Sequence, residues 1–149
     1  YMNRATQRLG KSGEYFTASV LSLVSDYVIV NTDGAQADLL FEHESDFLKV
    51  QVKTKSKREK RRPGWKFDIR RGSHSNERFF RKGYVDLFAL YCPQYKNILF
   101  RPFHETINEK GHSKTCIYVT DENMKNIDSM DSLKSALNSI KEYNKLKCN

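Results

Sequence analysis

The hydrophobic positions along the chain recur with two different periods, and each period predicts a type of element. Apolar residues return every three to four positions in residues 4–25 and 130–146, which predicts two amphipathic helices, the second with Ser129 or Asp131 as its N-cap. Between the helices, short runs rich in β-branched and aromatic residues predict strands. These strands are expected at residues 27–32, 37–43, 47–53, 65–71, 84–92, 97–103 and 116–120.

The order of these elements indicates the fold class. A helix, several strands and a final helix predict a mixed central β-sheet flanked by helices, of the α/β or α+β class. Residues 84–92 are apolar at most positions, as expected of a central strand, and residues 97–103 are expected to pair with them. The chain has 149 residues and no repeat or low-complexity linker, so a single domain over 1–149 is expected.

A hairpin is predicted where the second and third strands are joined by the short sequence ESD. If the turn is centred between Glu44 and Ser45, Asp38 faces Gln51 across the ladder. Side chains two residues apart share one face of a strand, so Lys53 then lies on the same face as Gln51. A shift of the register by one residue would separate these side chains. The pattern therefore predicts a carboxylate, an amide and an ammonium group on one face of the sheet.

The net charge of the chain comes from one segment. The chain carries 26 Lys and Arg against 18 Asp and Glu, a net charge of +8. Residues 53–72 hold ten Lys and Arg and two Asp and Glu, so they account for the whole excess. Such a block repels itself unless an anion or solvent neutralises it. Nucleic acid is the expected partner, and a solvated loop or a contact with an acidic membrane or protein is the alternative.

Aromatic residues within this segment favour a structured binding element over a solvated loop. Trp65 is expected either to pack on the sheet or to contact DNA. His74 lies just beyond the segment and is the histidine expected to meet a phosphate. The full set of expected DNA contacts is Lys55, Lys57, Arg58, Lys60, Arg61, Arg62, Trp65, Lys66, Arg70, Arg71 and His74.

Cysteine content and hydropathy narrow the class of protein. The three cysteines, Cys92, Cys116 and Cys148, form no C-x-x-C motif, which indicates reduced thiols in a cytoplasmic protein and argues against a zinc cluster. No apolar run is long enough to span a bilayer, and the N-terminus lacks the hydrophobic region of a signal peptide. We therefore expect no membrane association.

The polar set on the hairpin is the set that phosphodiester hydrolysis requires. Oxygen ligands such as Asp38 and Gln51 can hold Mg²⁺, which polarises a phosphate and lowers the pKa of a bound water. A lysine such as Lys53 can stabilise the charge that develops on the phosphate or orient the attacking water. Asp33 competes with Asp38 for the role of the acidic ligand. Each of these residues, taken alone, could also be an ordinary solvated side chain.

Four stretches resemble the motifs of a known family. GEYF in the first helix, then ADLLF, VQVKT and YVDLFALYCP, are similar to the PD-(D/E)XK nuclease superfamily. They most resemble its branch of group I intron-encoded and free-standing phage homing endonucleases. The resemblance covers most of residues 8–103 and implies a restriction-endonuclease-like core.

The resemblance also implies the site residues. Glu14 corresponds to the helix acid, Asp38 to the motif aspartate, Gln51 to the (D/E) position and Lys53 to the motif lysine. Glu14, Asp38 and Gln51 are then expected to bind Mg²⁺, with Mn²⁺ as a substitute. Two positions depart from the motif: Ala37 replaces the proline before the aspartate, and Gln51 replaces an acid. Gln51 lowers the negative charge of the site by one, so more of the metal binding falls on the two acids and the phosphate.

The implied function is a Mg²⁺-dependent DNA endonuclease of homing type that cuts a long, specific double-stranded target. A double-strand break needs two sites, so a homodimer or homotetramer is expected, with the C-terminal helix or residues 84–103 as interface. The expected location is the cytoplasm of a bacterial or phage-infected cell. A Holliday-junction resolvase-like nuclease and a nucleic-acid-binding module with a vestigial site are the alternatives.

Overall fold

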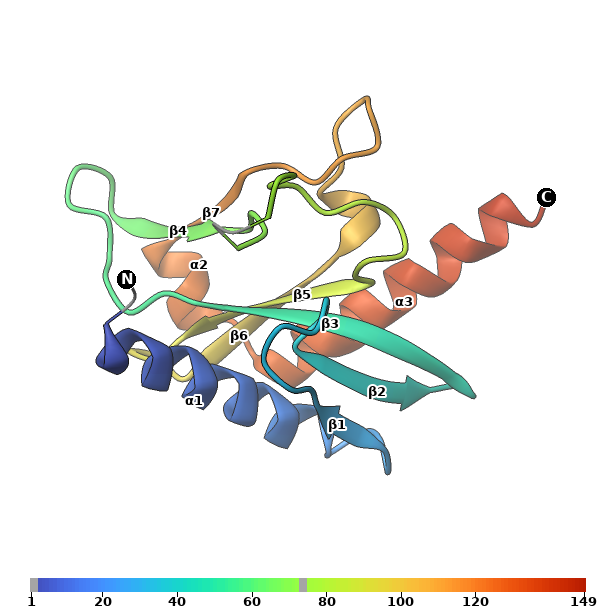
Figure 1. Ribbon diagram of the computed structural model, residues 1–149, viewed down its shortest axis with the longest axis horizontal. Helices are drawn as coiled ribbons and strands as arrows, with labels where there is room; N and C mark the ends of the chain where they lie inside the picture. The colour runs from blue at the N-terminus through green and yellow to red at the C-terminus, as the bar shows by residue number, and fades with distance from the viewer. Residues whose placement is uncertain (1–2, 73–74) are drawn as a thin grey trace.

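The computed structural model describes residues 3–72 and 75–149, and its centre is a five-stranded sheet with two long helices against one face (Figure 1). The elements, in chain order, are α1 (Arg4–Leu21), β1 (Val28–Val30), β2 (Leu39–His43), β3 (Asp46–Thr54), β4 (Gly64–Asp68), β5 (Leu87–Cys92), β6 (Asn97–Pro102), the 3₁₀ helix η1 (Phe103–Glu105), β7 (Cys116–Thr120), α2 (Asp121–Asn126) and α3 (Ser129–Lys147).

The central sheet has the strand order β1-β2-β3-β5-β6. Its pairs are antiparallel except β3 with β5, which run parallel. This mixed sheet with flanking helices confirms the predicted fold class. The expectation of a central strand at residues 84–92 is also confirmed, because β5 lies between β3 and β6 and all six of its residues are buried.

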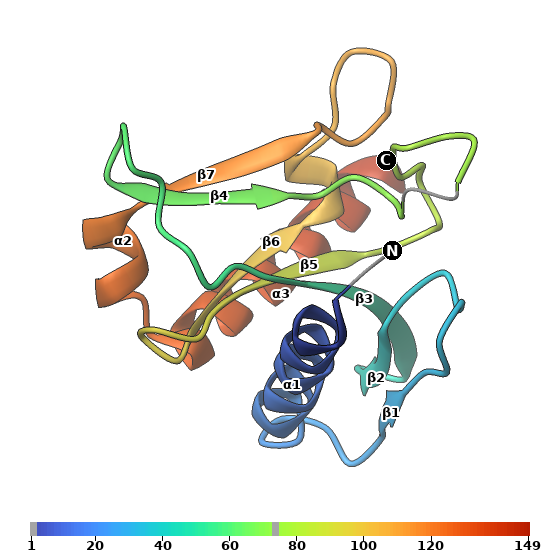
Figure 2. The ribbon, with the colours of Figure 1, turned by 60° about the vertical axis from the view of Figure 1, so that its left-hand side comes forward.

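The segment expected as a strand at residues 65–71 lies elsewhere. β4 does not join the central sheet but pairs with β7 in a separate antiparallel ribbon. Figure 2 shows this ribbon on one side of β3, with α1, β1 and β2 on the other side. The ribbon covers β5 and β6 because its inward residues, among them Trp65 and Phe67, pack on the second face of the sheet.

Two hydrophobic cores result, one on each face of the sheet. The first core joins α1 and α3 to the face that carries Val50, Val52 and Ala89. The second core joins the ribbon and α2 to the face that carries Phe88 and Leu90. Successive side chains of a strand point to opposite faces, so β5 contributes to both cores. The ribbon leaves part of the second face of β3 uncovered, and the candidate site lies on this uncovered part.

The predicted hairpin register is confirmed. Leu39 pairs with Val50. The turn residues Glu44 and Ser45 have positive φ values of 50° and 68°, as in the type I′ turns that join antiparallel strands. Asp38 precedes the first paired residue, and its N–H donates to the carbonyl oxygen of Val50 at 3.0 Å. Asp38 thus bends out of the ladder, which ends at the pair of Leu39 with Val50, and the expected pairing of Asp38 with Gln51 is not formed.

Helix boundaries differ from the expectation in three places. The first helix ends at Leu21 rather than residue 25, and the following Leu23 is 76% exposed, so no packing supports a further turn. The N-cap of α3 is Asp128, whose side chain accepts from the N–H of Asp131. Neither Ser129 nor Asp131 is the cap. The short helix α2 was not predicted, since its six residues are too few to show a period.

The free edge of β6 is covered by serines of α3. The Ile98 N–H donates to the Ser129 hydroxyl and the Phe100 N–H donates to the Ser132 hydroxyl, both at 2.8 Å. Such capping protects an edge strand from pairing with another chain. Since β5 is buried as well, the expectation that residues 84–103 form a subunit interface is not supported.

Within the described residues, no helix is both long and apolar enough to cross a membrane.

Candidate active site

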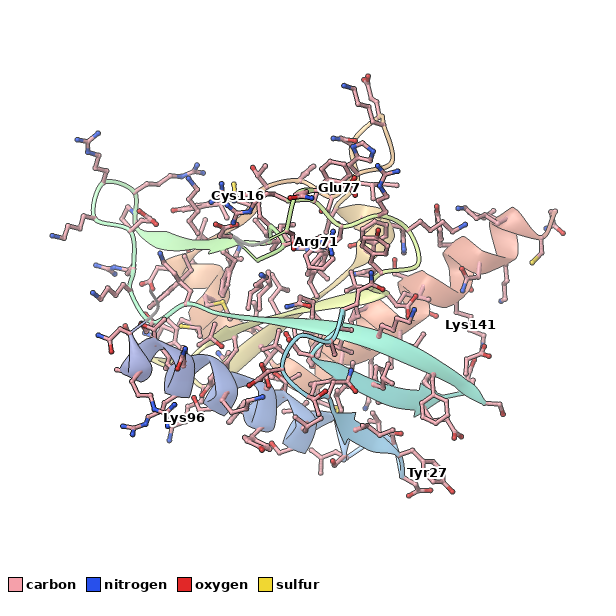
Figure 3. All side chains as sticks on the ribbon, viewed as in Figure 1. Tyr27, Arg71, Glu77, Lys96, Cys116 and Lys141 are labelled. Carbon is pink, nitrogen blue, oxygen red and sulfur yellow. The ribbon has the colours of Figure 1, made fainter. Side chains whose placement is uncertain are left out.

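A polar cleft of about 470 Å³ opens on the uncovered face of β3. Gln51 and Lys53 lie on one wall, and the segment after β4 supplies Arg71 and Ser75 to another. Arg71 lies between β3 and the loop that carries Glu77, to whose carbonyl oxygen it donates a hydrogen bond of 3.3 Å (Figure 3). The structure thus brings two of the four expected catalytic residues into one cleft with an arginine.

Asp38 is held beside this cleft by the backbone of β3. Its Oδ2 accepts from the Val52 N–H at 2.8 Å. Burial raises the pKa of Asp38 to about 6, although the Val52 hydrogen bond opposes the rise. The negative charge of Glu14 adds to the rise, and the positive charges of Lys53 and Lys11 oppose it. Glu14, Lys53 and Lys11 therefore all act electrostatically on Asp38.

The other candidate aspartate occupies a different environment. Asp33 has a side chain that is 95% exposed, and its contact is an ion pair with Lys11 at 3.3 Å. It has neither the β3 hydrogen bond nor the burial of Asp38. Of the two, Asp38 is the residue bound to the backbone of β3 next to Gln51, which favours it for the motif role.

Lys53 is tied to the end of the ribbon. Its Nζ donates to the carbonyl oxygen of Arg70 at 2.8 Å. Burial lowers the pKa of Lys53, and the charges of Asp38 and Asp68 oppose that effect. Asp68 also binds the Arg70 side chain, with Oδ1 accepting from Nε at 2.9 Å, so the turn that supplies the carbonyl group is itself fixed. The ammonium group is thus partly desolvated and held at the rim of the site.

Close packing of α1 on β3 positions Glu14. A Cβ atom added to Gly13 would lie 2.0 Å from the Thr54 hydroxyl oxygen, so only glycine permits this approach. The group that comes nearest to Gly13 is thus the Thr54 side chain. Glu14 follows directly, is 17% exposed, and accepts from the Lys11 ammonium at 2.7 Å. The Thr54 hydroxyl is buried and has no hydrogen-bond partner among the described residues.

The available donors suit a hard divalent cation. Glu14 and Asp38 offer carboxylates whose mutual repulsion a cation would relieve, and Gln51 offers an amide oxygen on β3 next to the Val52 N–H that binds Asp38. Residues 3–72 and 75–149 contain no cluster of three His, Cys, Asp or Glu that could hold a metal. Mg²⁺ prefers oxygen ligands and keeps several waters, so two acids and an amide are an adequate set.

One expected DNA contact is wrong. Trp65 is fully buried in the second core, stacks edge-on against Tyr95, and its Nε1–H donates to the Asp121 carboxylate at 3.1 Å. It therefore packs on the sheet, which is the alternative role that its sequence position allowed.

The other residues of the basic segment fall into three groups. Lys57, Lys60, Arg61 and Lys66 are exposed. Lys55, Arg58 and Arg70 form ion pairs with Glu59, Asp121 and Asp68, respectively. Arg62 lies over the ring of Tyr118, and Arg71 lines the cleft. His74 lies outside the described residues. The charge of the segment is thus spread from the cleft to the loop between β3 and β4.

Two residues of the site region were missed by sequence reasoning. Lys11 precedes Glu14 by three residues, a helical spacing at which ion pairs form, so the pattern did contain this signal. Asp121 binds Trp65, Tyr95 and Arg58, which lie 56, 26 and 63 residues away in sequence. No local pattern indicates such a contact.

Comparisons with known proteins agree with this geometry. The sequence model of the PD-(D/E)XK endonuclease family matches residues 6–135. Among solved structures, the chain is similar to a bacterial homing endonuclease, I-Ssp6803I, with a TM-score of 0.63 and 20% identity. That alignment covers 89% of this chain and 96% of the other. No curated protein sequence matches the chain.

Proposed function

Because this chain belongs to the PD-(D/E)XK endonuclease family, we propose that it is a metal-dependent DNA endonuclease of homing type that cuts a long, specific duplex. The observation that carries the proposal is the convergence on β3: Gln51 and Lys53 share one cleft, and the Asp38 carboxylate accepts a hydrogen bond from the N–H of Val52, the residue between them. The similarity in fold to a bacterial homing endonuclease, at 20% sequence identity, supports the homing type.

Each residue has a distinct role in this proposal. Glu14, Asp38 and Gln51 would hold Mg²⁺, for which Mn²⁺ can substitute. Such an ion polarises the phosphate and lowers the pKa of a bound water. Lys53 places its ammonium group where negative charge develops on the scissile phosphate, because a partly desolvated cation stabilises that charge more strongly than one in water. Arg71, across the cleft, can hold a neighbouring phosphate oxygen.

A plasmid assay tests the proposed activity. Supercoiled DNA carrying the cognate site should be nicked or linearised in Mg²⁺ or Mn²⁺ and remain intact in EDTA, while binding to DNA persists in EDTA. Asp38→Asn is the control, since it keeps the shape of the side chain and removes a charged ligand. Cutting at full rate in excess EDTA would contradict metal dependence, and a preference for four-way junctions would favour the resolvase alternative.

We propose that the basic loop, residues 55–63 between β3 and β4, contributes much of the affinity for DNA. Each phosphate neutralised adds about −0.9 to the slope of log K against log salt. Replacing the exposed residues Lys57, Lys60 and Arg61 by glutamine should therefore flatten the slope by about 2 to 3 if all three meet phosphates. Fluorescence anisotropy at several salt concentrations in EDTA measures this slope.

The control for this measurement removes the same charge from α3, which packs on β6. It replaces three exposed lysines of that helix by glutamine: Lys134, Lys141 and Lys145. If the slope changes equally in both triple variants, only net charge matters. If it changes in neither, the basic loop is a solvated loop.

We further propose that the protein acts as a homodimer or homotetramer, since one chain offers one site and a double-strand break needs two. The C-terminal end of α3 extends beyond the sheet and leaves Leu146 77% exposed, which makes it the favoured interface (Figure 1). Leu146→Glu should weaken assembly in light scattering on cognate DNA. Leu23→Glu, equally exposed at the end of α1, should not. A monomer both free and on DNA would contradict the proposal.

A further inference from the structure

One ammonium group lies among the carboxylates of the site, and the catalytic roles described above leave it unassigned. Lys11 Nζ is 2.7 Å from the nearer carboxylate oxygen of Glu14 and 3.3 Å from that of Asp33. Its charge also acts on Asp38. These contacts raise the pKa of Lys11, most of all the hydrogen bond to Glu14, so the side chain stays charged.

We propose that Lys11 is the internal counter-ion of the metal site. Its ammonium group pairs with Glu14 while the site is free of metal. When Glu14 binds the divalent cation, the lysine side chain rotates and its ammonium group pairs with Asp33 instead. This inference rests on the proposed function, because it assumes that Glu14 and Asp38 are metal ligands. It assigns a positioning role to Lys11 and a partner role to Asp33.

The charges of the site support such an exchange. Glu14 and Asp38 carry two negative charges, which Lys11 and Lys53 balance when no metal is present. A divalent cation brings two further positive charges into this small space. Like charges at short range repel strongly where water is partly excluded, so the most easily moved cation should leave. Lys53 is fixed by the carbonyl group of Arg70, whereas Lys11 is 34% exposed and is already shared between two carboxylates.

The geometry provides the place to which Lys11 can move. Asp33 already contacts the same ammonium group, so a rotation of the lysine side chain is enough to exchange partners. The Asp33 side chain is 95% exposed against 17% for Glu14. The pair with Asp33 therefore forms in water and costs no desolvation of a second buried group. The more buried carboxylate is left free for the metal.

Metal affinity without DNA tests the proposal, because it does not depend on catalysis. Mn²⁺ is titrated into the protein and the free ion is followed by electron paramagnetic resonance. Lys11→Met should bind Mn²⁺ about fivefold more tightly, the upper end of what a partly exposed ion pair contributes. Arg8→Met, which removes a charge one turn away on α1, is the matched control and should leave the affinity unchanged.

Asp33→Asn should change the Mn²⁺ affinity in the opposite direction. Together with Lys11→Met it forms a double-mutant cycle. Without its second partner, Lys11 stays on Glu14, so this variant should bind Mn²⁺ more weakly. In the Lys11→Met background the same substitution should have no effect, because Asp33 acts only through the lysine. Lys11→Met should also unfold at a lower temperature in EDTA and recover when Mn²⁺ is added.

The possible outcomes separate this inference from the proposed function. Equal affinity of wild type and Lys11→Met, or an equal gain in Arg8→Met, overturns the counter-ion role. An effect of Asp33→Asn that persists without Lys11 overturns the exchange. If wild type and Asp38→Asn both fail to bind Mn²⁺, the metal site itself is wrong and the proposed function fails with it. Circular dichroism confirms that each variant is folded.

Discussion

Replacing Lys53 by alanine is expected to lower the rate of DNA cleavage by about 10²–10³-fold, the usual effect of removing one preorganised electrostatic group. The ammonium group of Lys53 lines the cleft and interacts with Asp38, and no water can replace its charge. The fold should survive, because the side chain lies on the uncovered face of β3. Single-turnover cleavage at saturating Mg²⁺ measures the effect.

Variants of Gln51 provide the comparison. Gln51→Ala removes a neutral ligand that water can replace, so the rate should fall less and the Mg²⁺ requirement should rise. Gln51→Glu restores an acid and should cut at lower Mg²⁺. If a folded Gln51→Ala protein cuts like wild type at every Mg²⁺ concentration, the glutamine is not a ligand. If Lys53→Ala retains the wild-type rate, the assignment of the catalytic lysine is wrong.

The second large effect is expected at Gly13, where α1 touches β3. In an exposed helix, Gly→Ala usually stabilises by about 0.5–1 kcal/mol. At Gly13 the added Cβ would lie 2.0 Å from the Thr54 hydroxyl oxygen and 3.2 Å from the Tyr91 ring. We expect Gly13→Ala to destabilise by about 1–3 kcal/mol, as overpacking does, and to slow cleavage because Glu14 moves with the helix.

Two further variants make this prediction specific. Gly10→Ala is the matched control, because its Cβ would meet nothing within 4 Å, and it should stabilise. Thr54→Ala should partly rescue Gly13→Ala, since it removes the 2.0 Å contact but leaves close contacts of 3.3 Å with the Cβ of residue 54 and 3.2 Å with the Tyr91 ring. Thr54→Ala alone should cost little, because the hydroxyl group it removes is buried without a partner among the described residues. Urea unfolding of wild type, the two single variants and the double variant measures the coupling, and a Gly13→Ala protein as stable as Gly10→Ala would contradict it.

The part of the site on the hairpin was predictable because its determinants are local. Alternation along β2 and β3, together with the two-residue turn at Glu44 and Ser45, was enough to set Leu39 opposite Val50, although Asp38 itself bends out of the ladder. A shift by one residue would expose the apolar face of both strands, so the register is strongly determined. The helix acid Glu14 was reached through the resemblance rather than through the pattern.

The ribbon was not predictable, because its contacts join distant parts of the chain. β4 looks like an edge strand in sequence, yet its partner β7 lies about fifty residues later, and nothing local indicates that pairing. For the same reason Trp65 was assigned to DNA as readily as to the core: a tryptophan in a basic segment suits both. The burial of Trp65 and its hydrogen bond to Asp121 decide between them, and both exist only in the folded chain.

The two hydrophobic cores have a consequence for how this nuclease can evolve. Packing of α1 on β3, which sets Glu14 beside Asp38, belongs to the first core, whereas the ribbon rests on the second. Substitutions on the exposed side of the ribbon and its loop are remote from the first core, and distant changes act independently. If the basic loop and the ribbon contact DNA as proposed, a lineage can change its DNA preference by altering exposed positions such as Lys57 and Lys66, while selection preserves the proposed cleavage residues unchanged.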